Sequence, residues 1–194
     1  EAYSHGIFPW FNPNEPVLWW SPDPRMVLIP EEFRVSRSLA KALRSNMYEV
    51  RVDTAFEQVM RACAAPRGKQ PGTWINEDMI AAYCALHLSG YAHSVEVWIS
   101  GRLAGGLYGV SIGKMFYGES MFSDVSNGSK IALAHLTRQL ERWRYGMIDC
   151  QMNTPHLASL GAREIPRREF ILRLQELIHC DPATHWQFDT DLFP

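Results

Sequence analysis

The 194-residue sequence lacks the features that define several large classes of protein. It contains no run approaching the ~18 consecutive apolar residues that a membrane-spanning helix needs, and no signal-peptide pattern. Its four cysteines form no C-x-x-C pair, and neither they nor the seven histidines show the spacing of metal ligands. We therefore expect free thiols in a reducing cytoplasm, with no metal and no membrane partner.

The composition is that of an ordinary globular protein. Hydrophobic residues make up 46% of the chain and charged residues 21%. A formal net charge of −2 argues against a protein that is basic throughout, but it is compatible with a local basic face. The length suffices for one core, or for one domain with a small appendage. Because the chain begins at Glu1 rather than Met, we expect further residues to precede it.

The stretch 105–130 organises the rest of the sequence. It predicts two strands joined by a tight turn at Gly113, followed by a polar loop that opens a helix. Glycines interrupt both strands, and glycine in a strand marks a bulge or the close approach of a ligand or another backbone. Glu119 stands between aromatic residues, where a carboxylate needs a partner or a shifted pKa. The loop 124–130 would present free N–H groups to an anion. This stretch is the predicted active cleft.

A polar pair follows on the predicted strand 147–151. Asp149 and Gln151 stand two positions apart, so alternation places them on one face and Cys150 on the other. The pair could hold a nucleophile beside the cleft, or it could be a structural pair at the end of a strand. Cys150 as nucleophile with His156 as base is a weaker alternative, because a reactive thiolate needs an exposed, electropositive setting.

A basic stripe is predicted on the helix 37–45, which Ser36 would cap. Arg37, Lys41 and Arg44 recur at i, i+4 and i+7 with no acidic residue between them. Such a stripe is either a solvated face or a surface for a phosphate backbone.

The overall pattern is α+β, with a sheet flanked by helices in the order found in the acyl-CoA N-acyltransferase (GNAT) fold. Residues 6–14 are too rich in proline for regular structure, and 65–73 read as a mobile loop. Asp53 or Thr54 would cap the helix that ends near Ala64. Further helices are predicted at 76–89, 129–145, 155–160 and 167–179. Strands are predicted at 17–21, 25–29 and 48–52, in a meander at 92–123, and at 147–151 and 186–188.

Nine motifs in collinear order give the chain a resemblance to a known family: GIFPWF (6–11), LWWSPDPR (18–25), GTWI (72–75), HSVEVW (93–98), GGLYGV (105–110), FYGESMFS (116–123), SK (129–130), IDCQ (148–151) and HLASLGAREIPRREF (156–170). Together they strongly resemble the bacterial leucyl/phenylalanyl-tRNA–protein transferases, over nearly the whole chain. The resemblance implies that residues 1–24 are the remainder of a small N-terminal lobe and that 25–194 form an acetyltransferase-like catalytic domain.

The resemblance also implies an activity. Leu or Phe, and less efficiently Met, would move from aminoacyl-tRNA to the N-terminal Arg or Lys of an acceptor protein, which marks that protein for degradation. No metal or coenzyme would be needed.

The resemblance assigns roles to individual residues. Trp10 and Trp74 would flank the terminal adenosine, and Glu119 would contact an amino group of donor or acceptor. Asp149 with Gln151 would orient the attacking amine, and Asp149 would serve as proton acceptor or electrostatic anchor. The Leu or Phe side chain would enter an apolar pocket formed by Leu107, Phe116, Leu133, Leu136, Leu140 and Ile148. The acceptor-stem phosphates would lie on Arg37, Lys41 and Arg44.

Two alternatives remain at this point. A coenzyme A-dependent N-acetyltransferase would need a pyrophosphate loop of the type R/Q-x-x-G-x-G/A, and residues 126–130 (SNGSK) do not match it. An RNA-binding module without catalysis would use the tryptophans and the basic stripe. A hydrolase is excluded, because 118–122 lacks the second glycine of a G-x-S-x-G elbow.

Overall fold

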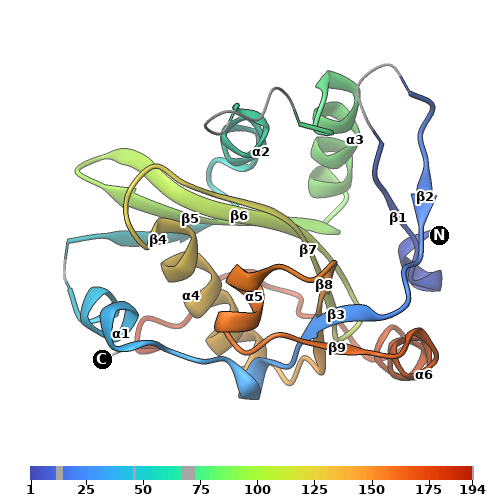
Figure 1. Cartoon of the computed structure of the whole chain (residues 1–194). Helices are drawn as coiled ribbons and strands as arrows, with labels where there is room; N and C mark the ends of the chain where they lie inside the picture. The colour runs from blue at the N-terminus through green and yellow to red at the C-terminus, as the bar shows by residue number, and fades with distance from the viewer. Residues whose placement is uncertain (12–14, 46, 67–72, 194) are drawn as a thin grey trace.

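The computed structural model describes residues 1–11, 15–45, 47–66 and 73–193. Its centre is a seven-stranded mixed sheet with the order β4-β5-β6-β7-β8-β3-β9 and helices on both faces (Figure 1). The sheet strands are β3 (Arg25–Leu28), β4 (Glu49–Val52), β5 (Ala92–Ile99), β6 (Arg102–Ile112), β7 (Met115–Ser123), β8 (Met147–Gln151) and β9 (Arg163–Ile165). A separate ribbon pairs β1 (Phe8–Pro9) with β2 (Trp19–Trp20). The helices are η1 (Tyr3–His5), η2 (Pro30–Glu32), α1 (Arg37–Leu43), α2 (Phe56–Ala64), α3 (Glu77–Leu88), α4 (Gly128–Arg142), α5 (Pro155–Ser159) and α6 (Arg167–Leu177).

The predicted meander is confirmed as β5, β6 and β7, which pair antiparallel. Ser100 and Gly101 make the first turn with φ of 49° and 74°, and Gly113 makes the second with φ of 59°. These left-handed values suit tight hairpin turns. At its other side β7 pairs with β8 in parallel, so the meander joins the second half of the sheet through one parallel contact.

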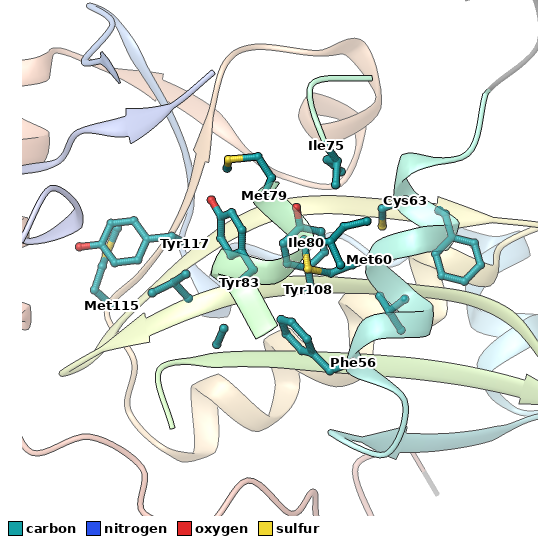
Figure 2. Packing of buried hydrophobic residues seen from close by; sticks show 14 of the residues in the cluster. Phe56, Met60, Cys63, Ile75, Met79, Ile80, Tyr83, Tyr108, Met115 and Tyr117 are labelled. Atoms are coloured by element: carbon teal, nitrogen blue, oxygen red, sulfur yellow. The ribbon is translucent and has the colours of Figure 1, made fainter. Parts of the chain in front are cut away.

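Two apolar layers enclose the sheet. One lies under α2 and α3 and includes Tyr83 and Tyr108, as Figure 2 shows. The other lies under α4 and includes Leu107 and Phe116. Neighbouring residues of β6 therefore enter opposite layers, as strand geometry requires. Gly105 allows α4 to begin directly against β6, because a Cβ there would lie 2.6 Å from the Cα of Gly128.

The helix starts follow the sequence with one exception. The side chains of Ser36 and Asn76 cap α1 and α3 as predicted. The prediction that Asp53 or Thr54 caps α2 is wrong. The carboxylate of Glu96, on β5, accepts the backbone N–H groups of Thr54 and Ala55 at 3.0 and 2.9 Å. Asp53 instead accepts from a backbone N–H of β5, and α2 begins after Ala55 without a side-chain capping bond.

Three further expectations are corrected. Residues 186–188 form no strand. The aromatic side chains of this segment cover the layer under α4 without a partner strand. The Trp186 ring stacks on His93 with 3.7 Å between the ring centroids. Phe8–Pro9 is a short strand inside the segment expected to be irregular. The strand β9 was not predicted. Most of the predicted loop 65–73 lies outside the described residues.

Candidate active site

The candidate site lies where two parallel strands separate. β7 and β8 pair through three residues each, ending at Tyr117 and Asp149, and no further pairing joins them in the described chain. Glu119 on β7 and Gln151 on β8 lie just beyond the last pair and line a cavity of about 120 Å³. Both strands belong to the middle of the sheet (Figure 1), so the gap between them leads into the interior.

The wall of this cavity is mostly apolar. Five of the side chains predicted for it do line it, namely Leu107, Phe116, Leu133, Leu136 and Ile148. Leu140 does not line it and is fully buried in the layer under α4. Tyr108, Met121 and Leu157 line it without having been predicted. A cavity of ~150 Å³ with an aliphatic wall binds benzene, so this cavity has the size and polarity for a leucine or phenylalanine side chain.

A second chamber of about 170 Å³ adjoins the cavity, and the two share Glu119, Cys150, Gln151 and Leu157. Trp10 and Trp74, which were expected to flank the adenosine, both line this chamber. The ribbon holds Trp10 in place, because its backbone N–H bonds to the carbonyl of Leu18 and its carbonyl accepts from the Trp20 ring. The Trp10 side chain is nevertheless 41% exposed, so it presents an aromatic surface to a ligand.

Glu119 is the acidic residue shared by the two cavities. The hydroxyl groups of Tyr3 and Tyr83 each donate a hydrogen bond of 2.8 Å to its carboxylate. Burial raises its pKa to about 7, against the effect of these two hydrogen bonds. A carboxyl with this pKa changes charge near neutral pH, which suits it to binding or exchanging a proton with an amine.

Asp149 points away from the cavity into a fully buried ion pair with Arg25. Its two oxygens accept from Nε and Nη2 of Arg25 at 2.8 and 2.6 Å. The guanidinium lies over the rings of Phe8 and Phe170, and its Nη1 donates to the carbonyl of Gly6. The pair thus connects the N-terminal segment to β8.

The expected alternation along β8 breaks at its end. The φ of Gln151 is 60°, and its backbone N–H bonds to Oδ1 of Asp149 at 2.9 Å. Gln151 therefore lines both cavities together with Cys150, while Asp149 does not. The prediction that Asp149 and Gln151 share a face opposite Cys150 is wrong, because a left-handed residue reverses the pleat. The buried Nε2 of Gln151 has no hydrogen-bond partner in the described structure.

A thiolate mechanism does not fit the site. Burial and the charge of Asp149 raise the pKa of the Cys150 thiol well above its ordinary value. His156 lines a different hollow, with Ser123 at the end of β7 and Ser129 at the start of α4. Cys150 therefore lacks both the electropositive setting and the base that a nucleophilic thiol needs.

The basic stripe lies apart from the cavities. Arg37, Lys41 and Arg44 are exposed on and after α1, which packs beside α4 (Figure 1). No ion pair within 4.0 Å joins them to an acid in the part of the chain that the structure covers. Within the same residues, no group of three His, Cys, Asp or Glu side chains could hold a metal ion, and no helix is long and apolar enough to cross a membrane.

Sequence reasoning missed the residues that hold the site together. Arg25 had a usable signal, since a charge at the start of the apolar run RMVLI needs a buried partner. Tyr3, Tyr83 and Tyr108 had none, because a tyrosine in an apolar segment is most often a core residue. The Tyr108 hydroxyl is buried without a partner among the described residues and lines the first cavity.

The sequence is similar to proteins of a known family. A family model described as leucyl/phenylalanyl-tRNA protein transferase matches residues 27–175, and a model of that family's N-terminal domain matches residues 1–23. A leucyl/phenylalanyl-tRNA–protein transferase of Nitrosospira multiformis is 65% identical over 190 residues, covering 97% of this chain and 82% of that protein. Those of Nitrosomonas europaea and Thiobacillus denitrificans are each 64% identical, covering 97% and 98% of this chain and 80% and 84% of those proteins.

Proposed function

The chain belongs to the leucyl/phenylalanyl-tRNA protein transferase family, and from that premise we propose how its two cavities divide the reaction. The enzyme is an aminoacyltransferase that moves an amino acid from tRNA to a protein. In the proposal, the donor carries Leu or Phe, and less efficiently Met. The acceptor is the α-amine of an N-terminal Arg or Lys, and the product carries a degradation signal.

The observation that carries this proposal is the junction of an apolar cavity with a tryptophan-lined chamber. The aminoacyl side chain occupies the cavity, and the terminal adenosine lies between Trp10 and Trp74. Stacking of a base on an aromatic side chain contributes ~1–3 kcal/mol. In this proposal the ester lies at the junction, beside Glu119 and Gln151.

The cavity also accounts for a relaxed choice of amino acid. An apolar pocket distinguishes substrates that differ by one methylene by only ~1–3 kcal/mol. The flexible side chain of Met121 is part of the wall and adapts to different shapes. Leu, Phe and Met are therefore all accepted, while polar side chains leave their hydrogen-bonding groups unpaired.

In the reaction, the nitrogen of the acceptor amine attacks the ester carbonyl carbon. A new C–N bond forms, the ester C–O bond breaks, and the ribose oxygen leaves as a hydroxyl group, taking up the proton that the amine nitrogen loses. The α-amine has a pKa of ~8, so a useful fraction is already neutral at pH 7. Glu119 contacts the amine and accepts its surplus proton, since its pKa lies near 7.

Gln151 and Asp149 orient the reactants. An amide is a poor base, so the side chain of Gln151 donates from its unpartnered Nε2 toward the substrate rather than removing a proton. Asp149 is a positioning residue, because both of its oxygens are held by Arg25 and one also holds the backbone of Gln151. Positioning of two substrates is the main requirement when the donor is an activated ester.

The tRNA body lies on α1, where Arg37, Lys41 and Arg44 contact acceptor-stem phosphates without reading sequence. We further propose a GNAT-like fold for residues 25–194, supported by the parallel strands that part in the middle of a mixed sheet. Residues 1–24 are then part of a small N-terminal lobe.

A transfer assay tests the function. The protein is incubated with labelled Phe-tRNA and an Arg-ended peptide, and in parallel with labelled acetyl-coenzyme A. We expect label on the peptide from Phe-tRNA only, and little when the peptide begins with Ala. Label from acetyl-coenzyme A alone would support an N-acetyltransferase, and retained tRNA without transfer would support a binding module.

A further inference from the structure

A hollow of about 310 Å³ lies at the start of α4, and Ala65, Asp124, Ser129 and His156 are among the residues that line it. These residues come from the ends of α2 and β7, the first turn of α4 and α5. We call this site the α4 hollow. Its volume is at the lower end of the range of ligand pockets, ~300–1,000 Å³. The proposed reaction gives it no role.

The α4 hollow lies next to both substrate cavities. Met121 lines the hollow and also the apolar cavity. Around α5, Thr154 and Leu157 line the tryptophan-lined chamber, whereas His156 lines the hollow. The first turn of α5 therefore lies between the chamber and the hollow, and a group attached to a ligand in the chamber can reach the hollow.

Side chains rather than backbone groups make this hollow suitable for an anion. The Lys130 side chain has no ion pair with an acid and no hydrogen bond among the described residues. It lies close to the His156 ring, because its charge, together with burial, lowers the pKa of that histidine. The backbone N–H groups of Gly128 and Ser129 are already bonded, to the carbonyl of Val125 and the hydroxyl of Ser123. The sequence had suggested that the loop backbone would bind an anion, but here Lys130 and His156 are the available groups.

The hollow also lies on the face of the sheet that carries the basic stripe. Leu39 and Leu43 of α1 and Leu157 of α5 all pack in the layer under α4. Figure 1 accordingly shows α1, α4 and α5 on one face of the sheet. A single strand that runs from phosphates on α1 to an adenosine in the chamber must cross this face, where the α4 hollow adjoins the chamber.

We propose that the α4 hollow binds the nucleotide that precedes the terminal adenosine of the tRNA, with the phosphodiester between the two nucleotides on Lys130 and His156. The inference rests on the proposed function, which places the adenosine in the chamber. The apolar wall at the end of α2, which includes Ala65, packs against the nucleoside without reading its base. Asp124 is exposed in the same lining and repels a phosphate, so its charge weakens this site.

The test uses three ligands that cannot react: phenylalanyl-adenosine joined by an amide bond, the same compound with a 5′-phosphate, and the same compound extended by a 5′-linked cytidylyl group. Their Kd values are measured by calorimetry for the wild type and for Lys130→Gln. In the wild type we expect the phosphate and the cytidine each to lower Kd. In Lys130→Gln the affinity gained from the phosphate should fall about fivefold, while Kd for phenylalanyl-adenosine is unchanged.

Three further variants separate the phosphate from the nucleoside. Ala65→Trp fills the hollow from an exposed position at the end of α2, so it should abolish the gain from cytidine and retain the gain from the phosphate. Asp124→Asn removes a negative charge and should increase the gain from the phosphate. Arg168→Gln is the matched control for loss of a positive charge, since Arg168 is exposed on α6 and outside the hollow, and it should change no Kd.

The outcomes distinguish the hollow from the reaction. The inference is overturned if the phosphate and the cytidine add nothing to the affinity of phenylalanyl-adenosine for the wild type. It is also overturned if Lys130→Gln weakens the unphosphorylated and phosphorylated compounds equally. Transfer from Phe-tRNA can continue in both cases, so the proposed function would stand. If the Lys130-dependent gain is present but no Phe reaches an Arg-ended peptide, the assignment of the hollow holds and the proposed reaction fails.

Discussion

Arg25 and Asp149 form a bidentate ion pair in which neither side chain is exposed to solvent. The pair joins β3 to β8, and through Asp149 it fixes the left-handed backbone of Gln151. The geometry of the proposed reaction site therefore depends on a charge pair that no substrate reaches.

Removal of Asp149 is expected to reduce stability and to abolish transfer. Asp149→Ala leaves Arg25 buried without its partner, which costs about 3–5 kcal/mol. We expect that loss in the free energy of unfolding measured with urea, and no detectable transfer, while tRNA still binds under native conditions. Glu49→Ala breaks the exposed pair with Arg51 and should change stability little. Unchanged turnover in Asp149→Ala would remove this residue from the proposed mechanism.

Glu119 is expected to produce a pH dependence of transfer near neutrality. Its pKa is raised to about 7, so transfer should increase as the carboxyl ionises across that pH. The Glu119→Gln variant should transfer slowly, and its rate should not rise across the pKa of the carboxyl. The titration of the acceptor amine near pH ~8 should remain in both proteins. The profile of kcat/KM for the peptide between pH 5.5 and pH 9, roughly the range of the two groups, measures this.

The folding stability of the protein is also expected to depend on the ionisation of Glu119. It should fall as pH rises, whereas transfer should increase. The folded state holds the Glu119 proton more tightly than the unfolded state, since the pKa is raised from 4.5 to about 7. Relative to Glu119→Gln, the wild type should lose about 3 kcal/mol as pH rises between these two values. Urea unfolding at a series of pH values tests this, and a difference that does not vary with pH would contradict it.

Leu133 is expected to influence the choice between Leu and Phe. Leu133→Phe fills part of the 120 Å³ cavity and should lower kcat/KM for Phe-tRNA relative to Leu-tRNA by about tenfold or more. Leu140→Met is the matched control, because Leu140 is buried in the same layer without lining the cavity. An altered Leu-to-Phe ratio in the control would show that the cavity wall has been assigned incorrectly.

The basic stripe is expected to act through charge alone. Arg37→Ala with Lys41→Ala should weaken tRNA binding and reduce the slope of log Kd against log salt by about 1 per lost phosphate contact. Arg102→Ala with Arg168→Ala removes the same charge from exposed positions elsewhere. Equal effects of the two double variants would mean that α1 is a solvated face.

Most local structure in this chain was predictable from sequence because its causes are local. Alternation and turn residues predicted β5, β6 and β7, and Ser36 and Asn76 predicted the starts of α1 and α3. Six apolar residues were assigned to a side-chain pocket through a family resemblance, and five of them line the cavity. Spacing alone could not separate Leu140 from them, since it lies on the same helix as Leu133 and Leu136.

The arrangement of charge in the site was decided by the tertiary structure. Asp149 points to Arg25, 124 positions earlier, and Glu119 is held by tyrosines from η1 and α3. Whether a carboxylate faces solvent, a cation or a hydroxyl depends on which distant segments the fold brings to it. The sequence by itself determined most of the elements and the family, through periodicity and motif. Only packing decided which acid is anchored and which lines the cavities, because burial and pairing belong to the assembled chain.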